Sequence, residues 1–396
     1  MLKSGVLDSR MRISFFDKEK FTDPENIKKL HTIASFLVLA LMAALFVYFF
    51  WPLAQPKADF YNELWGPAYL MLHGQSPYNT ASLDPVLPAA WFPMAIGFFS
   101  PLGWLSENIA LLVWFLICTL ELFIIVSLSQ GSSRAVHVTL IAALLAFSFP
   151  PTLYHFFLGQ ITLTVALCMI LAAQSITKGN HWLAAFLIAL GLSKPHLGIL
   201  AVVGMSIHYL KQGGARTMIT FYLRIASMII LLCLPLFFAY PDWIPDAIAS
   251  MRSNSYWVYP SLFVLLQRNA GAFGVFIWGL VVVSALSLIY FLWKKLPPVN
   301  AMFWSLGLAL LVTPYLGSWD FVLLLPILIS AFSQANWKRK LFLVLSYLLA
   351  WYGMALIQSM EPSHNYYFWW VPPWFLASVA IVTHWKEYMN RQIKTS

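Results

Sequence analysis

Charged side chains are scarce in this chain of 396 residues, where Asp, Glu, Lys and Arg together make up 10%. Soluble domains usually carry about 25% of such residues. Hydrophobic residues make up 60% of the chain, and a soluble fold could not hide that much apolar surface from water. The composition therefore excludes a soluble protein and predicts a polytopic membrane protein whose helices face lipid.

Cysteines and the common catalytic motifs are also sparse. The sequence contains no glycine-rich phosphate loop, no His/Cys metal-ligand spacing and no nucleophile-elbow serine. The three cysteines lie in apolar runs, as is typical of small buried side chains and not of disulfide frameworks. They are Cys118, Cys168 and Cys233. We expect no cofactor, and the lack of a carboxylate cluster favours a protein that needs no metal.

Apolar runs of bilayer length recur along the chain and predict an all-α fold with about 12 transmembrane helices. One region, between His181 and Leu210, is split by Lys194 and Pro195. A lysine at the centre of a span would cost about 3 kcal/mol and proline interrupts a helix, so we expect two short helices that meet at Lys194. The other expected spans lie at 31–52, 105–129, 135–150, 157–177, 217–240, 271–293, 300–316, 319–334, 338–358 and 369–385.

The basic residues predict how these helices are oriented. When the N-terminus is placed in the cytoplasm, most of the 24 Lys and Arg residues fall on the inner side. The net charge of +9 therefore reflects membrane topology, and nucleic-acid binding is not expected. The outer side keeps only Lys57, Lys194, Arg252 and Arg268. We expect one transmembrane domain in the plasma (inner) membrane, at 31–385, between cytoplasmic tails at 1–30 and 386–396.

The outer connections are long and rich in aromatic residues, whereas most inner connections are short. The long outer loops are expected at 53–104 and 241–270, and segment 60–73 is expected to form a short amphipathic helix on the membrane surface. Their aromatic residues fit an interfacial belt. Long loops on one side also indicate that this side carries the function.

Asp59, Lys194 and His196 are the first candidate site residues on that outer side. A carboxylate at the membrane surface could act as a general base, although an ordinary loop acid would look the same. A lysine at a helix break suits a phosphate, or it could bind the carbonyl groups at a helix C-terminus. His196 would lie in the same outer turn as Lys194.

Several other polar residues near the outer surface have two interpretations each. Arg252 and Arg268 could clamp a phosphate or bind lipid headgroups. Gln160 could bond a sugar hydroxyl or tie two helices together. Asp320, next to Trp319, could orient a cation or a sugar, or it could cap a helix N-terminus.

Glu121 and Arg224 lie inside predicted spans, each about two turns from the cytoplasmic end of its helix. We expect them to form a structural ion pair at matching depth.

An ordered set of short motifs resembles glycosyltransferase family 87, the polyprenol-phosphate-mannose-dependent mannosyltransferases of the GT-C fold class. The resemblance covers roughly residues 50 to 330. The motifs are Asp59-Phe60-Tyr61 with Gly74-Gln75-Ser76-Pro77-Tyr78, Phe92-Pro93 with Pro101-Leu102, Gly159-Gln160, Gly191-Leu192-Ser193-Lys194-Pro195, Asn254-Ser255 with Arg268, Thr313-Pro314, and Ser318-Trp319-Asp320.

The resemblance implies an inverting transfer of a sugar, mannose or another hexose or pentose, from a polyprenyl-phosphate donor. The acceptor would be a lipid or glycan on the non-cytoplasmic face, and Asp59 would be the general base. The substrate-binding residues would be Tyr61, Gln160, Lys194, His196, Arg252, Asn254, Ser255, Arg268, Trp319 and Asp320, with the lysine and both arginines near the donor phosphate.

The chain departs from the family pattern at two places. Phe321 stands where the family often has a histidine after its Trp-Asp pair, so that role is missing or passes to His196. Phe92-Pro93-Met94 replaces the usual double proline after the aromatic residue. The identity of the sugar and of the acceptor is therefore not carried over from the family.

Two other classes of function remain open. A transporter or flippase of a lipid-linked sugar would also suit about 12 spans, but such proteins commonly show inverted repeats and broken helices at the bilayer midplane. The sequence has no visible repeat, and its polar residues gather on one face. A non-catalytic membrane partner of a glycan assembly complex is the third interpretation.

Overall fold

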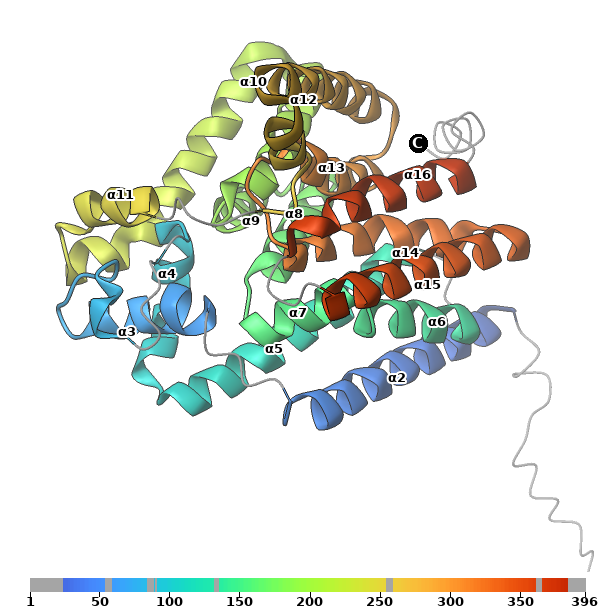
Figure 1. Ribbon diagram of the computed structural model, residues 1–396, viewed down its shortest axis with the longest axis horizontal. Coiled ribbons are helices and arrows are strands. Elements are labelled where there is room, and N and C mark those ends of the chain that lie inside the picture. The colour runs from blue at the N-terminus through green and yellow to red at the C-terminus, as the bar shows by residue number, and fades with distance from the viewer. Residues whose placement is uncertain are drawn as a thin grey trace, which may run out of the picture.

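The computed structural model describes residues 24–53, 59–83, 89, 91–131, 135–253, 259–360 and 365–383. Every regular element in these ranges is helical (Figure 1). The elements are α2 (Pro24–Phe50), η1 (Phe60–Trp65), α3 (Gly66–Leu72), η2 (Thr80–Ser82), α4 (Pro93–Phe99), η3 (Ser100–Trp104), α5 (Glu107–Ser129), α6 (Val136–Phe147), α7 (Pro150–Leu158), α8 (Thr162–Thr177), α9 (His181–Gly191), α10 (Pro195–Ala239), α11 (Trp243–Ser253), α12 (Leu262–Lys295), α13 (Pro298–Val312), η4 (Ser318–Leu324), α14 (Leu325–Gln334), α15 (Trp337–Met360), η5 (Asn365–Trp370) and α16 (Val371–Thr383).

The structure supports a helical membrane protein but not the expected count of about 12 spans. In the described ranges, α2, α5, α10, α12 and α15 are long and apolar enough to cross a membrane. The pair α6 and α7, bent by 54°, would make a sixth span if its two helices cross together. Other apolar runs form helices of 10–17 residues, shorter than the roughly 20 residues that a straight span needs.

Helix α10 joins two apolar runs that the sequence suggested as separate. It is 45 residues long, and its backbone leaves the helical conformation at Gly213 and Gly214. The φ of +69° at Gly214 lies in the left-handed region, which glycine enters without a steric penalty. The chain turns back at the two glycines: the Ser206 and Tyr222 hydroxyls lie 2.7 Å apart, whereas a straight helix would separate these residues by about 24 Å. α10 is therefore two helical segments that pack side by side.

The predicted helix break at Lys194 is confirmed. Helix α9 ends at Gly191, and α10 begins at Pro195, where a missing backbone N–H costs no helical hydrogen bond. Between them, the Ser193 carbonyl accepts a hydrogen bond of 3.1 Å from the backbone N–H of Phe92. This bond fixes the break against the start of α4.

Helix α8 lies at the centre of the protein. Almost all of its residues are buried, and it packs against α5, α9 and α13. A helix that is apolar all round is stable when protein surrounds it. The run expected as a span at 157–177 therefore contains a helix of 16 residues that is surrounded by protein.

A helix forms at 60–73 as expected, as η1 followed directly by α3. Most of its residues are buried in the protein, so an amphipathic surface helix is not what forms. η1 is a π-helix, a rare conformation that often occurs at functional sites. In Figure 1, α3, α4 and α11 gather at the left end of the molecule, while α2 begins at the right. The chain that follows α2 thus leads to α3 at the end of the molecule opposite the start of α2.

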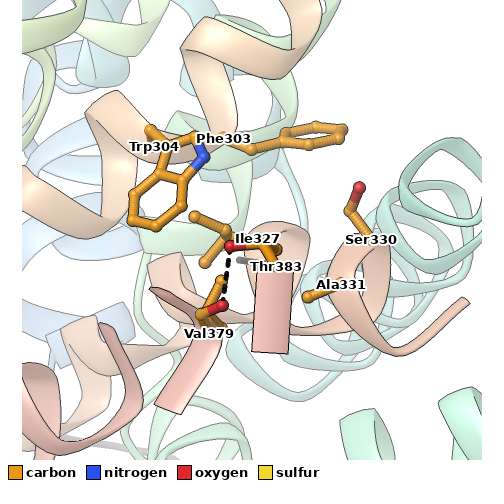
Figure 2. A pocket seen from close by; sticks show the side chains of 7 residues that line it. All are labelled: Phe303, Trp304, Ile327, Ser330, Ala331, Val379 and Thr383. Atoms are coloured by element: carbon orange, nitrogen blue, oxygen red, sulfur yellow. Dashed lines mark hydrogen bonds between the residues drawn. The ribbon is translucent and has the colours of Figure 1, made fainter. Parts of the chain in front are cut away.

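A small crevice lies between α13, α14 and α16 (Figure 2). Its one hydroxyl on α16, that of Thr383, donates to the Val379 carbonyl of the same helix at 2.9 Å. The crevice is otherwise mostly apolar and holds no cluster of charged groups. Its lining residues are Phe303, Trp304, Ile327, Ser330, Ala331, Val379 and Thr383.

Gly159 ends α7 and allows the chain to pass closely over η1. Its φ is +69°, and a Cβ at this position would lie 2.5 Å from Cβ of Phe60. We expect Gly159→Ala to destabilise the fold twice over, by about 1 kcal/mol of backbone strain and by about 1–3 kcal/mol of overpacking. The midpoint of thermal unfolding of the detergent-purified protein measures this loss.

Gly179→Ala is the matched control for this substitution. Gly179 has a φ of +72° but nothing within 4 Å of its added Cβ, so it should show only the strain. Equal losses for the two variants would mean that the Phe60 contact relaxes at no cost.

Candidate active site

Asp59 and Gln160 meet where η1 passes over the end of α7. The left-handed turn at Gly159 redirects the chain, and the Gln160 N–H donates to the His155 carbonyl at 3.0 Å. The Gln160 side chain then donates a hydrogen bond from Nε2 to Oδ2 of Asp59. Gln160 is buried, whereas Asp59 is half-buried. A carboxylate is thus held at the edge of the protein by a buried amide.

Lys194 is the charged centre of this region. Its Nζ donates to Oε1 of Gln160 at 2.5 Å, to Oδ1 of Asp320 at 3.1 Å and to Oγ1 of Thr162 at 3.3 Å. The Trp91 ring centroid lies 5.8 Å from Nζ, within range of a cation–π interaction. The lysine therefore binds side chains from three segments and does not cap the carbonyl groups of a helix.

Asp320 both pairs with Lys194 and caps η4. Its Oδ1 accepts from Lys194 and, at 2.5 Å, from the Thr162 hydroxyl. Its Oδ2 accepts from the backbone N–H of Gly317 at 2.9 Å. The two interpretations of Asp320 are therefore compatible, because each carboxylate oxygen serves one of them.

These contacts form a continuous chain that we call the outer polar network. Its ion pair is almost fully buried, with side chains 7% and 2% exposed for Lys194 and Asp320. Buried charges are tolerated when they are paired and hydrogen-bonded. The network consists of Asp59, Gln160, Thr162, Lys194 and Asp320.

The position of Asp59 in the network changes its acidity. Burial raises the pKa of the carboxyl group to about 6, although the charge of Lys194 and the hydrogen bond from Gln160 both lower it. The negative charge of Asp320 acts in the same direction as burial. A carboxylate with a pKa near 6 is ionised at neutral pH and binds a proton more readily than an ordinary aspartate, as a general base requires.

Half-buried aromatic side chains lie beside the network. The His196 ring lies edge-on to Tyr315 at 5.1 Å, and the Tyr315 ring lies 4.3 Å from that of Tyr259. The Thr313 hydroxyl donates to the His196 carbonyl at 2.8 Å, which ties the start of α10 to the end of α13. His196 thus lies close to Lys194 in sequence, but its ring packs against tyrosine.

The structure places the other predicted residues outside the network. Arg252 is exposed in the last turn of α11, and the Arg268 guanidinium lies 5.1 Å from the centre of the Tyr366 ring. Tyr61 stacks on Trp65 at 5.1 Å. Trp319 is half-buried. The last two predicted residues, Asn254 and Ser255, lie outside the described residues.

Sequence reasoning missed three residues that the structure brings to the network. Thr162 binds both members of the ion pair, Trp91 lies beside the lysine, and Tyr315 packs on His196. Thr162 comes two residues after Gln160, and Tyr315 follows the Thr313-Pro314 motif. Proximity to these motifs was the signal that could have identified both. Trp91 directly precedes the Phe92-Pro93 motif in the same way.

The family model for glycosyltransferase family 87 matches residues 92–314, which is more than half of the chain. The chain belongs to glycosyltransferase family 87. Comparison with curated proteins and with solved structures gives no match. The resemblance expected from the motifs is thereby confirmed, and the protein is a membrane glycosyltransferase. The matched range contains Gln160 and Lys194, whereas Asp59 precedes it by 33 residues (92 − 59) and Asp320 follows it by six (320 − 314).

The predicted ion pair between Glu121 and Arg224 is wrong, because the structure gives each side chain a different partner. Glu121 accepts a hydrogen bond of 2.7 Å from Thr164, because α5 packs against α8. Arg224 lies 5.6 Å from the ring centre of Trp182 at the start of α9. Matching depth in the membrane did not bring the two side chains to the same face.

No group of three or more His, Cys, Asp or Glu side chains that could hold a metal ion occurs in the described part of this glycosyltransferase. The two aspartates of the outer polar network are held by Lys194 and Gln160. The cationic group available in this network is therefore an ammonium.

The buried ion pair predicts coupled effects on stability. Asp320→Leu leaves the Lys194 ammonium buried without its counter-charge and should lower the free energy of unfolding by about 3–5 kcal/mol. Lys194→Met combined with Asp320→Leu removes both charges, and should lose less than the two single substitutions added together. Denaturant titration in mixed micelles measures these free energies. Strict additivity would show that the two residues do not act as a pair.

Proposed function

We propose that the protein transfers a sugar from a polyprenyl-phosphate donor to a lipid or glycan acceptor, with inversion, on the non-cytoplasmic face of the plasma (inner) membrane. The sugar would be mannose or another hexose or pentose. The observation that supports this proposal is the outer polar network, in which a carboxylate and a buried ammonium are joined through a single amide. A base and a cation side by side are what displacement of a sugar phosphate needs.

Asp59 would act on the acceptor in this reaction. Its carboxylate takes the proton of the acceptor hydroxyl while that oxygen attacks the anomeric carbon of the donor. The bond from this carbon to the phosphate oxygen breaks on the opposite face, so one displacement inverts the configuration. The proton ends on Asp59 and the electron pair leaves with the phosphate.

Lys194 would hold the departing phosphate. Negative charge builds up on the phosphate oxygens as the bond breaks, and an ammonium in a buried site stabilises this charge more strongly than in water. The Nζ group has three donors, and two of its present acceptors are the neutral atoms of Gln160 and Thr162. A phosphate oxygen can replace one of them while Asp320 keeps the ammonium charged.

Arg252 and Arg268 would meet lipid headgroups in this proposal. Both side chains are exposed, and arginine at the interface attracts anionic lipid. The polyprenyl tail would stay in the hydrocarbon of the bilayer. The donor then reaches Lys194 from the membrane surface.

The proposed orientation places both chain termini in the cytoplasm. The positive-inside pattern of the sequence supports this orientation. The positions of the first and last described helices, α2 and α16, support it as well. Helix α2 begins and helix α16 ends toward the right in Figure 1, opposite α3, α4 and α11.

Removing the proposed base should abolish most of the transfer. We expect Asp59→Asn to lower kcat by about 10²–10⁴-fold, because the amide cannot take the acceptor proton, while binding of the donor is retained. The measurement is the initial rate of transfer from labelled polyprenyl-phosphate sugars by the protein purified in detergent.

Asp246→Asn is the control for that variant. Asp246 is another carboxylate of the outer segments, hydrogen-bonded to Ser76 at 2.5 Å, and its replacement should leave the rate nearly unchanged. Full activity of Asp59→Asn would overturn the assignment of the base. Movement of intact labelled donor across proteoliposomes without transfer would favour the flippase.

The rate should depend on pH through Asp59. Protonation below its pKa of about 6 removes the base, so kcat/KM should be level at neutral pH and fall about tenfold for each pH unit further into acid. The pH profile of kcat/KM at low donor concentration tests this. A profile that stays level through this range would mean that another group takes the proton.

A further inference from the structure

Gln160 connects the two charged groups of the proposed reaction through one rigid amide. Its Oε1 accepts from Lys194 at 2.5 Å, and its Nε2 donates to Asp59. The side chain is 2% exposed, so little water reaches the amide itself. A hydrogen bond at one end of an amide polarises the other end and strengthens the bond made there.

We propose that Gln160 is a positioning residue that makes the basicity of Asp59 depend on whether Lys194 holds a donor phosphate. The inference rests on the proposed function, because it assigns the base to Asp59 and the phosphate to Lys194. It adds a role for a side chain that touches neither reacting atom. The sequence alone left Gln160 between binding a sugar and tying helices together.

Without a donor, the network weakens the base. Lys194 stabilises the ionised form of Asp59 by its charge, and it also polarises the Gln160 amide so that Nε2 is a better donor. Both effects lower the pKa of Asp59 and partly offset the burial that raises it. The Asp59 carboxylate is therefore ionised but only weakly basic.

A bound donor reverses both effects. The phosphate brings negative charge to Lys194 and competes with Oε1 of Gln160 for its ammonium. The field of Lys194 at Asp59 is then partly cancelled, and the amide becomes a weaker donor to the carboxylate. Asp59 thus becomes a stronger base when the sugar is in place.

Departure of the phosphate completes the cycle. The acceptor proton lies on Asp59 after transfer, and the phosphate has gained the electron pair of the broken bond. When the polyprenyl phosphate leaves, Lys194 returns to Gln160 and again favours the ionised carboxylate. Asp59 then releases its proton to solvent and the starting state is restored.

Among the described residues, other ionisable groups face these residues from η4, α7, the start of α10 and α5, where the Cys118 thiol contacts the Gln160 carbonyl. Asp320 on η4 acts on Asp59 directly and keeps Lys194 in place. His155 on α7 and His196 at the start of α10 lie close enough to Lys194 and Asp320 to interact with both. Each of these groups remains in a Gln160 variant, so a change in that variant reports on the amide.

Gln160→Met tests the coupling, because methionine keeps the length of the side chain but neither donates nor accepts in the way that the amide does. In the wild type, kcat/KM reports the free enzyme and kcat reports the enzyme–substrate complex. We expect the acid limb of kcat to lie at higher pH than that of kcat/KM. In Gln160→Met, the acid limb of the kcat/KM profile should move to higher pH by about one pH unit. The difference in pH between the acid limbs of kcat and kcat/KM should therefore become smaller.

Gln130→Met is the matched control. Gln130 is also a buried glutamine, and its Oε1 accepts from Thr139 at 2.9 Å. Cys118 contacts the Gln160 carbonyl, and Gln130 lies farther along the same helix by about 18 Å. Its substitution should lower stability but move neither limb. If Gln160→Met lowered the rate by one constant factor at every pH, its role would be structural only.

Infrared spectroscopy tests the coupling without turnover. The band of the protonated Asp59 carboxyl, assigned by difference from Asp59→Asn, is titrated with and without a sugar-free polyprenyl phosphate. Wild type should show the midpoint move to higher pH with the probe, by about one pH unit, and Gln160→Met should show a smaller movement. A probe-independent midpoint in the wild type overturns the inference. The same movement with no sugar transfer would retain the coupling and reject the proposed function.

Discussion

The buried ion pair of Lys194 and Asp320 is the interaction on which the rest of the site depends. Two charges with side chains 7% and 2% exposed have lost their water, and they are tolerated because every remaining polar contact is supplied by protein. Thr162 and Gln160 provide neutral partners, and the Gly317 N–H binds the second oxygen of the carboxylate. The pair therefore fixes α8, α10 and η4 relative to one another.

Broken helices make this arrangement possible within an apolar protein. The chain interrupts its helices after α7, after α9 and after α13, and each interruption delivers polar residues to one place. Gly159 turns the chain so that Gln160 reaches Asp59, and Pro195 restarts the helix behind Lys194. Backbone that leaves the helix within an apolar protein needs polar partners, and the outer polar network provides such contacts at these breaks.

Local sequence signals predicted some parts of this structure well and others poorly. The break at Lys194 and the helix after Asp59 followed from proline, charge and apolar spacing. The number of spans did not, because a fully apolar run such as α8 looks the same whether lipid or protein surrounds it. The sequence placed Asp59, Lys194, Arg252 and Arg268 on one side of the membrane, but it could not separate the first two from the arginines. Contacts between segments 101 and 126 residues apart depend on packing that no local pattern encodes.

The amide of Gln160 also limits which residues can stand at that position during evolution. Its oxygen must face an ammonium and its nitrogen must face a carboxylate, so the replacement has to offer an acceptor on one side and a donor on the other. A glutamate would oppose Asp59, a lysine would oppose Lys194, and asparagine is one carbon too short to reach both. The side chain at position 160 must therefore be polar and must also present its acceptor and its donor to opposite sides. Relatives that change this residue should also change one of the two charged residues it joins.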